Sequence, residues 1–253
     1  MGQRVLITAG ASGIGLAMAH AFVANGAQVW LADIDAVAVA AAPDGMRADC
    51  LDVADEGAIA DLFARIGAEW GGLDVVCANA GIKGPTARLE DMPLDGWRDC
   101  LAVNLDAAFL ATKYAARMMK PAGKGVILYT SSTAGLYGFP LRAPYAAAKW
   151  GLHGLMKTAT MELGPYGIRA NAILPGSVEG PRMEAVLAAE AQAKGLSRDQ
   201  VYAAYAGGTS LRSFIGAEDI AAMAVFLASD AARFVTGQMV PVDGHIENPD
   251  PKV

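Results

Sequence analysis

The amino-acid sequence predicts an α/β protein with one parallel sheet that is covered by helices on both faces. Short, nearly continuous apolar stretches alternate with helix-forming segments through most of the 253 residues. Hydrophobic residues make up 54% of the chain, which is enough for the interior of one large domain. Neither a linker nor a repeat of fixed period interrupts the alternation. We therefore expect residues 1–253 to form a single domain.

Strands and helices are expected in regular order, with one insertion near the end. The expected strands are residues 5–8, 28–32, 46–51, 73–78, 125–130, 168–174 and 238–244. The expected helices are residues 16–24, 56–70, 94–119, 145–164, 181–195, 199–205 and 218–229. The insertion, residues 177–211, is rich in Ala and Gly and fits either a mobile lid over a site or a packed helical excursion. Residues 245–253 form a polar, proline-rich C-terminal tail.

Charge and cysteine content exclude several functional classes. The net charge of −6 and the pI of about 5.1 provide no basic surface for nucleic acid or an anionic membrane. No apolar run approaches the ~20 residues of a membrane span, and the strand pattern begins too early to leave room for a signal peptide. Cys50, Cys77 and Cys100 lack metal-ligand spacing and are expected to be reduced thiols. We expect a cytoplasmic protein that needs no metal.

A glycine-rich loop follows the first strand. Residues 9–15 read Ala-Gly-Ala-Ser-Gly-Ile-Gly and lead directly into a helix. Bare backbone lets a pyrophosphate approach, and the N-terminus of a helix favours its negative charge. Asp33 ends the second strand eighteen residues after Gly15, close to the spacing at which an acid accepts hydrogen bonds from an adenosine ribose. The alternatives are that Asp33 is a turn or helix-capping residue, or that Asp35 takes this role.

Tyr145 and Lys149 stand four residues apart at the start of an expected helix, directly after Pro144. At this spacing both side chains share one helix face. A phenol has a pKa near ~10, and a neighbouring ammonium lowers it toward the working range of a general base. Ser132 follows an apolar strand and can hydrogen-bond the substrate oxygen that Tyr145 would protonate or deprotonate. Taken alone, the pattern also fits a surface Tyr–Lys pair on an amphipathic helix.

One polar residue, Asn104, interrupts the apolar pattern of the helix expected over 94–119. A buried amide must satisfy its hydrogen bonds. Asn104 is therefore either a member of a structural network or a functional residue.

Together these residues resemble the short-chain dehydrogenase/reductase family over nearly the whole chain. Each motif is weak alone, but their order and spacing are specific. The matching positions are the loop from Thr8 to Gly15, Asp33, Asp52-Val53, Asn79-Ala80-Gly81, Asn104, Ser132, Tyr145, Lys149, Pro175-Gly176 and Val242-Asp243-Gly244. The resemblance implies a doubly wound, Rossmann-like parallel sheet of about seven strands. It also implies NAD as the hydride carrier and, commonly, a homotetramer.

The resemblance also assigns roles to these residues. It implies that Tyr145 is the general base or acid, that Lys149 lowers its pKa and bonds the nicotinamide ribose, and that Ser132 steadies the substrate oxygen. Asn104 would hold a water that links Lys149 to solvent. Ser132 is preferred to Ser131 because it lies thirteen residues before Tyr145, the family's spacing. The cofactor is expected to contact Gly10, Ser12, Gly13, Ile14, Gly15, Asp33, Asp52, Val53, Asn79, Ala80, Gly81, Tyr145, Lys149, Pro175, Gly176 and Val178.

Two positions depart from the family pattern. The first loop glycine is replaced by Ala9, whose methyl group narrows the approach to the phosphates and disfavours a positive φ. Gly180 stands where the family often has a threonine that holds the nicotinamide amide. Backbone groups are expected to replace that contact.

The expected substrate is a small oxygenated molecule such as a sugar, a sugar acid or a hydroxy acid. Its expected ligands are Ser132, Arg142, Tyr145 and Arg182, since a guanidinium suits bidentate capture of a carboxylate. Alternatively, Arg142 lies at a rim or a subunit interface and Arg182 pairs with a glutamate such as Glu179. The predicted function is NAD-dependent interconversion of a secondary alcohol and a ketone.

Two other functions remain as alternatives. A 3-oxoacyl thioester reductase would act on a substrate held by an acyl carrier protein, but such enzymes commonly use NADP and carry a basic patch for the carrier. A non-catalytic dinucleotide-binding sensor would usually lack a member of the Ser/Tyr/Lys set, and all three are present here.

Overall fold

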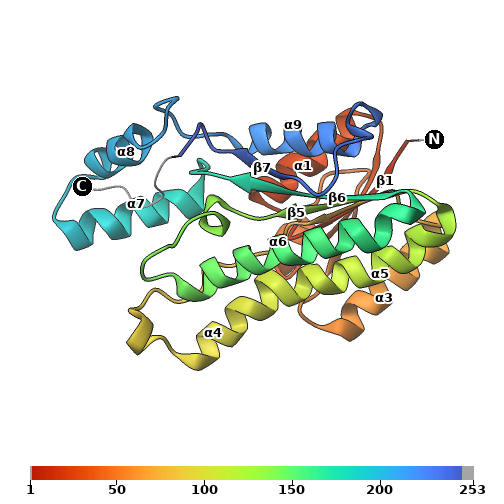
Figure 1. Ribbon diagram of the computed structural model, residues 1–253, viewed down its shortest axis with the longest axis horizontal. Helices are drawn as coiled ribbons and strands as arrows, with labels where there is room; N and C mark the ends of the chain where they lie inside the picture. The colour runs from red at the N-terminus through yellow and green to blue at the C-terminus, as the bar shows by residue number, and fades with distance from the viewer. Residues whose placement is uncertain (1, 247–253) are drawn as a thin grey trace.

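A seven-stranded sheet forms the middle layer of the computed structural model, which describes residues 2–246 (Figure 1). Its strands are β1 (Arg4–Thr8), β2 (Gln28–Asp33), β3 (Arg47–Cys50), β4 (Val75–Ala78), β5 (Gly125–Thr130), β6 (Ile168–Pro175) and β7 (Met239–Val242). They lie in the order β3-β2-β1-β4-β5-β6-β7, and every neighbouring pair is parallel. The doubly wound, Rossmann-like sheet predicted from the sequence is confirmed.

Helices cover both faces of this sheet. One face carries α3 (Glu56–Trp70), α5 (Ala107–Ala122) and α6 (Ala143–Leu163), and the other carries α1 (Gly13–Ala24) and α9 (Ala217–Ala228) (Figure 1). The remaining helices are α2 (Ala36–Ala40), α4 (Leu94–Leu101), α7 (Pro181–Lys194) and α8 (Arg198–Gly207). Short 3-10 turns lie at Leu89–Asp91, Thr133–Gly135, Gly164–Tyr166 and Asp230–Ala232.

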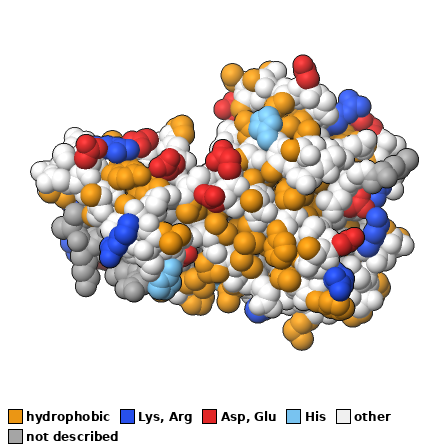
Figure 2. All heavy atoms as spheres, turned by 90° about the horizontal axis from the view of Figure 1, so that it is seen from above, with side chains coloured by type: hydrophobic (Ala, Val, Ile, Leu, Met, Phe, Trp, Pro, Cys, Tyr) orange, Lys and Arg blue, Asp and Glu red, His pale blue; other side chains and the backbone are white. Residues whose placement is uncertain are grey.

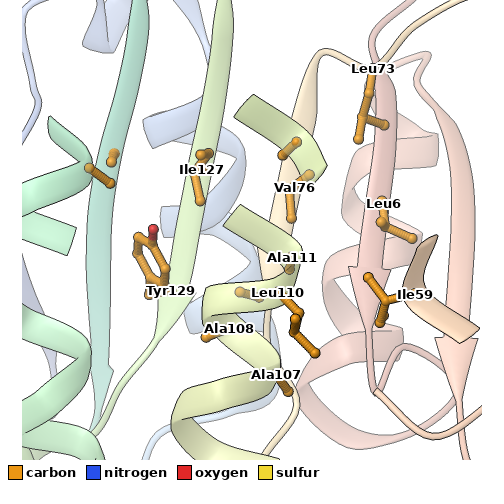
Figure 3. Close-up of a cluster of buried hydrophobic side chains, with 14 of the residues drawn as sticks. Leu6, Ile59, Leu73, Val76, Ala107, Ala108, Leu110, Ala111, Ile127 and Tyr129 are labelled. Carbon is orange, nitrogen blue, oxygen red and sulfur yellow. The ribbon is translucent and has the colours of Figure 1, made fainter. Parts of the chain in front are cut away.

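Apolar side chains fill the space between the sheet and each helix layer. Figure 3 shows part of the core on the α3 and α5 side, where Leu6, Val76 and Ile127 project from three neighbouring strands. Helix residues such as Ile59 and Ala111 lie against them, and all five side chains are fully buried. Because the central strands are covered on both faces, they read in the sequence as nearly continuous apolar runs.

The structure departs from the predicted elements in two places. The short helix α2 is absent from the prediction; the Asp35 carboxylate caps it by accepting hydrogen bonds from Val37 N and Ala38 N. The helix predicted over 94–119 is divided into α4 and α5 by a π-helical turn, Ala102–Asp106. Such a turn widens the helical repeat locally, which the apolar periodicity of the sequence does not reveal.

The insertion forms a small lobe at the carboxyl end of β6. Its helices α7 and α8 pack on each other around Leu187, Val201 and Phe214, a cluster separate from the two cores of the sheet. Figure 2 shows this lobe at the left of the molecule, where a notch divides it from the body. Ile246, within the segment predicted to be a polar tail, is buried. The rest of that segment, residues 247–253, lies outside the described part of the chain.

Candidate active site

A cavity opens at the carboxyl ends of the strands, where the strand order reverses between β1 and β4. Its volume is about 560 Å³. That is within the range of ~300–1,000 Å³ that small-molecule and cofactor sites occupy. The walls come from the glycine loop, the segments that follow β4, β5 and β6, helix α6 and the lobe. In open parallel sheets, a crevice at this reversal is the usual place for a ligand.

The glycine loop is folded so tightly that two of its positions leave no space for a side chain. A Cβ at Gly15 would lie 2.1 Å from the carbonyl oxygen of Ala9, and one at Gly10 would lie 2.8 Å from that of Ile7. Ala9 takes φ = 47°, a left-handed conformation that costs an alanine about 1–2 kcal/mol. The loop thus keeps a glycine-like conformation despite the substitution. The residues that line the cavity here are Ala9, Ser12, Gly13, Ile14 and Gly15.

Asp33 is buried at the end of β2 and is held against this loop. Its Oδ2 accepts a hydrogen bond from Ala11 N at 3.0 Å, and its Oδ1 accepts one from Asp35 N at 3.1 Å. Asp35 is the cap of α2, so Asp33 is the acid that contacts the glycine loop. A carboxylate in this position suits the ribose of a nucleotide whose phosphates lie on the loop.

Neutral side chains tie the carboxyl ends of β1, β4 and β5 together. Thr8 Oγ1 accepts hydrogen bonds from Asn79 N at 2.9 Å and from Ala80 N at 3.0 Å. The Asn79 amide donates to the carbonyl oxygens of Thr8 and Ala9, both at 3.1 Å. Its Oδ1 accepts a 2.9 Å bond from the Thr130 hydroxyl. This network fixes the glycine loop beside the cavity.

Tyr145 and Lys149 lie on one face of α6, and both line the cavity. The helix has Pro144 in its first turn, where a missing amide hydrogen costs nothing. Lys149 is only 3% exposed, and its ammonium donates to the Thr130 carbonyl at 2.8 Å. The same ammonium is 5.5 Å from the centre of the Tyr145 ring. A phenol with a buried cation beside it can exchange a proton with a ligand.

The π-helical turn places Asn104 close to this pair. Its amide nitrogen donates to the carbonyl oxygens of Ile82 at 3.0 Å and Cys100 at 2.8 Å. A Cβ at Gly81 would lie 2.7 Å from Asn104 Oδ1 and 3.3 Å from Lys149 Nζ, so nothing larger than glycine fits there. Oδ1 is buried and has no hydrogen-bond partner within the described residues. Such an acceptor is a place for a water or a ligand group.

The two serines after β5 differ in their surroundings. Ser132 is half-buried at the cavity wall, and its Oγ accepts a 3.2 Å bond from Ala134 N at the start of a 3-10 turn. Ser131 also borders the cavity but is 3% exposed. Its hydroxyl oxygen lies 2.8 Å from His153 Nε2 and 3.3 Å from the Lys149 carbonyl oxygen. The predicted choice of Ser132 as the catalytic serine is compatible with this arrangement.

Arg142 borders the cavity immediately before α6. Its Nε donates to the Lys83 carbonyl at 3.1 Å. The guanidinium lies 5.6 Å from the centre of the Phe139 ring and 5.3 Å from that of Tyr145. Arg142 is thus close to the proposed proton-transfer group. Arg182 belongs to α7, but its side chain lies outside the described part of the structure, so its contact with substrate stays a prediction.

The lobe gives the cavity a largely apolar wall. It is built from Met183 and Val186 of α7 and from Tyr205 of α8, with Ile246 beside them, and Glu179, before α7, adds one carboxylate. These contacts join segments far apart in the sequence, and local periodicity carries no signal for them.

The predicted cofactor residues divide into two groups. Besides the loop residues, those at the cavity wall are Asn79, Gly81, Tyr145, Lys149, Pro175, Gly176 and Val178. Those away from the wall are Gly10, Asp33, Asp52, Val53 and Ala80. Among these, Val53 is buried in the core, and Asp52 is an exposed turn residue that accepts a 2.9 Å bond from Ala54 N.

The roles of the Thr8 and Thr130 hydroxyls and of His153, next to the site, were not predicted from the sequence. The signal for the two threonines was a hydroxyl at the carboxyl end of an apolar strand. The signal for His153 was its position eight residues after Tyr145, on the same helix face.

The described residues contain neither a membrane-spanning helix nor a candidate metal cluster. None of the helices combines the length and the apolar character that crossing a membrane requires. Likewise, His, Cys, Asp and Glu side chains do not gather in groups of three or more with metal-binding geometry in this part of the chain.

A doubly wound sheet with a glycine cradle at its reversal point and a Tyr–Lys pair in the adjoining cavity is typical of dinucleotide-dependent oxidoreductases. A family model described as enoyl-(acyl carrier protein) reductase matches residues 8–245. This match and the similar proteins described in the next paragraph show that the chain belongs to the short-chain dehydrogenase/reductase family. The protein is therefore an oxidoreductase.

Three similar proteins illustrate the relationship. The cis-4-hydroxycyclohexanecarboxylate dehydrogenase of Sinomonas cyclohexanicum is 38% identical, and the match covers 94% of each chain. The D-beta-hydroxybutyrate dehydrogenase of Rhizobium meliloti is 33% identical over 96% of this chain and 98% of the relative. Among solved structures, an NAD+-bound xylitol dehydrogenase superposes with a TM-score of 0.90 at 30% identity, covering 96% of this chain and 98% of the other.

Proposed function

We propose that this protein is an NAD-dependent dehydrogenase that interconverts a secondary alcohol and a ketone on a small hydroxy acid. The observation that carries the proposal is the placement of Ser132, Tyr145 and Lys149 around one cavity that also contains the glycine loop. In this arrangement, a substrate in the cavity can contact both the proton-transfer group and a dinucleotide bound on the glycine loop. The dehydrogenases among the relatives support it.

The loop end of the cavity fits a dinucleotide. The loop closes tightly on itself at Gly15 and presents bare backbone at the N-terminus of α1, which suits a pyrophosphate. Asp33 would accept hydrogen bonds from the adenosine ribose, and its charge would disfavour a 2′-phosphate, which would select NAD over NADP. When bound, the nicotinamide ring exchanges a hydride with the substrate carbon. The relative crystallised as NAD+-bound xylitol dehydrogenase supports this choice of cofactor.

Tyr145 moves the proton. In alcohol oxidation its phenolate oxygen takes the hydroxyl proton of the substrate, and in ketone reduction its phenol returns one. The Lys149 ammonium stabilises the phenolate by charge attraction. The Ser132 hydroxyl hydrogen-bonds the same substrate oxygen and stabilises charge that develops on it. Asn104 Oδ1 and the Lys149 ammonium both lie beside Gly81, and a water on this buried acceptor would connect the ammonium to solvent.

The substrate end of the cavity combines the cation of Arg142 with a mostly apolar wall, and the Glu179 carboxylate at its edge accepts a hydrogen bond from Tyr202. The Arg142 guanidinium binds a carboxylate bidentately, and Arg182 is a second candidate from the lobe. Met183, Val186 and Tyr205 cover the carbon skeleton. An apolar wall leaves the hydroxyl groups of a sugar without partners, whereas a short or cyclic hydroxy acid buries carbon there. The two relatives named for hydroxycyclohexanecarboxylate and hydroxybutyrate support this preference.

The lobe of residues 177–211 is proposed to close over the substrate. Gly180, at the start of α7, takes φ = 135°, a conformation that L residues rarely adopt, so the lobe is joined to β6 through glycine-dependent backbone. The separate cluster around Leu187 lets the two helices move as one unit.

A homotetramer in the cytoplasm is the proposed working state. Large apolar side chains on the surface, among them Phe234 at 89% and Met161 at 79% exposure, provide area that self-association would cover. Figure 2 shows hydrophobic side chains gathered on the face that α1 and α9 form. The cysteines are thiols rather than disulfides, which suits a reducing compartment.

The test is the oxidation of a substrate panel with NAD and with NADP, followed by nicotinamide absorbance. The panel contains 3-hydroxybutyrate, both 4-hydroxycyclohexanecarboxylate isomers, xylitol and neutral cyclohexanol, with an acetoacetyl thioester offered in the reverse direction. We expect the highest kcat/KM for a hydroxy acid with NAD. Preference for the thioester with NADPH would favour the carrier-protein reductase, and binding of NAD without turnover of any substrate would favour the sensor.

A further inference from the structure

His153 lies one turn beyond Lys149 on α6. Tyr145, Lys149 and His153 stand at i, i+4 and i+8, so all three side chains share one helix face. His153 is 7% exposed and has no part in the mechanism described above. It is not among the residues that line the cavity; its ring packs against the turn that carries Ser132.

The imidazole ring contacts this turn at two points. Its Nε2 lies 2.8 Å from Ser131 Oγ, on one side of Ser132. On the other side, a Cβ at Gly135 would lie 2.6 Å from the ring's Cε1 and 3.0 Å from its Nε2, so the turn backbone lies directly on the ring. The backbone N–H of Ser131 also donates to the Ile173 carbonyl at 2.8 Å, which extends the pairing of β5 with β6 past the strand end.

The surroundings of His153 favour the neutral imidazole. Burial lowers its pKa, and the cations of Lys149 and Lys157 on the same helix lower it further. A neutral ring can complete a chain of hydrogen bonds in which its Nε2–H donates to Ser131 Oγ and the serine hydroxyl donates to the Lys149 carbonyl, 3.3 Å away. The turn and the helix are thereby joined by side-chain bonds.

We propose that His153 is a positioning residue that fixes the hydroxyl of Ser132 relative to the phenol of Tyr145. Tyr145 belongs to α6 and Ser132 to the turn after β5, so their separation depends on how the turn is held on the helix. His153 holds it through Ser131 and Gly135, on either side of the catalytic serine. This inference rests on the proposed function, because it concerns two groups that meet at one substrate oxygen.

Three variants test it, with kcat, KM, NADH affinity and melting temperature measured for each. His153→Leu keeps the apolar volume but removes the hydrogen bond; we expect kcat to fall about ten- to a hundredfold, as for a misplacement of about 1 Å. NADH affinity should stay within about twofold of wild type, since the glycine loop is elsewhere. His153→Gln, whose amide nitrogen can replace Nε2, should recover most of kcat. Ser131→Ala should lower kcat similarly, and combining it with His153→Leu should add little.

The controls separate this inference from the proposed function. Wild type must oxidise a hydroxy acid and Tyr145→Phe must not; failure there overturns the proposed function and this inference together. If those controls hold and His153→Leu keeps kcat within about threefold of wild type, the positioning role alone is wrong. Equal losses in His153→Gln and His153→Leu would also overturn it. If His153→Leu does not fold, Ser131→Ala decides, and wild-type kcat in that variant contradicts the inference.

Discussion

The three central strands carry a polar trio at each end, and the two trios differ in kind. The amino-end trio consists of Arg4, Asp74 and Lys124, at the starts of β1, β4 and β5. The carboxyl-end trio consists of Thr8, Asn79 and Thr130, at the ends of the same strands. The residues of the first trio are charged, and their charges are paired with one another. The second is neutral and adjoins a cavity with an open acceptor, Asn104 Oδ1.

At the amino end, Asp74 is paired with both neighbouring cations. Its carboxylate accepts hydrogen bonds from the Arg4 guanidinium at 2.8 and 3.1 Å and from Arg4 N at 3.0 Å, and Lys124 Nζ lies 3.0 Å away. Burial raises the pKa of Asp74, but the hydrogen bonds from Arg4 and Lys124 outweigh it and hold the pKa well below its usual range. Every charge here has a partner within the chain.

At the carboxyl end, the charged residues lie next to the glycine loop and the cavity. Neutral Thr8, Asn79 and Thr130 position the backbone there, while Lys149 lines the cavity and Asp33 is hydrogen-bonded to the glycine loop. The comparison teaches that the charged residues at the amino end of the sheet stabilise the fold, whereas the neutral residues at its carboxyl end position a binding site. Substitutions at the carboxyl end should therefore change binding and turnover, and those at the amino end should change stability.

The largest effect is expected at the glycine cradle. In Gly15→Ala the new Cβ would lie 2.1 Å from the Ala9 carbonyl oxygen, which is backbone and cannot turn aside. The loop must shift, so NADH should bind about a hundredfold to ten-thousandfold more weakly, the value of two hydrogen bonds to a charged phosphate. Fluorescence titration with NADH measures this. Gly154→Ala, at an open position on α6, is the matched control and should bind NADH normally.

Asp33 should decide the cofactor. We expect kcat/KM with NAD to exceed that with NADP by at least about a hundredfold, because a buried carboxylate repels the 2′-phosphate. Asp33→Asn keeps an acceptor oxygen for Ala11 N and removes the charge, so the preference should shrink to about tenfold or less. Steady-state kinetics with both cofactors give the ratio. Comparable wild-type values for NAD and NADP would refute this role for Asp33.

Arg142 tests the substrate end. Arg142→Leu should raise KM for a hydroxy acid by about ten- to a hundredfold, near the value of one charge-assisted bond. It should leave turnover of neutral cyclohexanol almost unchanged. Arg142→Lys keeps the charge without the planar fork and should fall between the two. Equal losses on the acid and on the neutral alcohol would mean that Arg142 only supports the loop at Lys83.

The smallest predicted effect, on stability alone, belongs to the amino-end trio. Asp74→Asn should lower the free energy of unfolding by about 1–3 kcal/mol at neutral pH and leave kcat/KM unchanged. Because the folded pKa of Asp74 is depressed, its contribution is fully present above the unfolded value of about 4 and is lost progressively as the pH falls from there toward the folded pKa. The difference between the urea titrations of the two proteins should therefore begin to shrink below about pH 4 and vanish only at pH values below the folded pKa. Glu69→Gln, which breaks the exposed Arg47 pair, is the control and should change little.

Local patterns predicted most of the fold and much of the site. Apolar runs located the interior strands, since strands buried on both faces leave a continuous signal. The edge strand β3, Arg-Ala-Asp-Cys, is only partly buried and was predicted from the alternation of strands and helices. The helical spacing of Tyr145 and Lys149 correctly placed both on one face of α6. The glycine loop and the spacing from Gly15 favoured Asp33, and the structure supplied the reason against Asp35, because Asp35 caps α2.

What the sequence could not predict depends on contacts between distant segments. The π-helical turn at Asn104 breaks the periodicity on which helix prediction relies. The bond between Ser131 and His153 joins a strand end to a helix interior, and no local pattern contains it. Ala9 has a left-handed φ, which alanine disfavours. This conformation is held by the hydrogen bond from the Asn79 amide, after β4, to the Ala9 carbonyl oxygen.

The most direct test of the account is Tyr145→Phe, assayed for turnover and for cofactor affinity in the same preparation. The account predicts that kcat falls about a thousandfold or more on the best hydroxy acid, because the phenol oxygen carries the proton in the transition state. It also predicts that the NADH dissociation constant stays within about threefold of wild type, since the glycine cradle is untouched. A variant that keeps more than about a tenth of wild-type kcat would contradict the account.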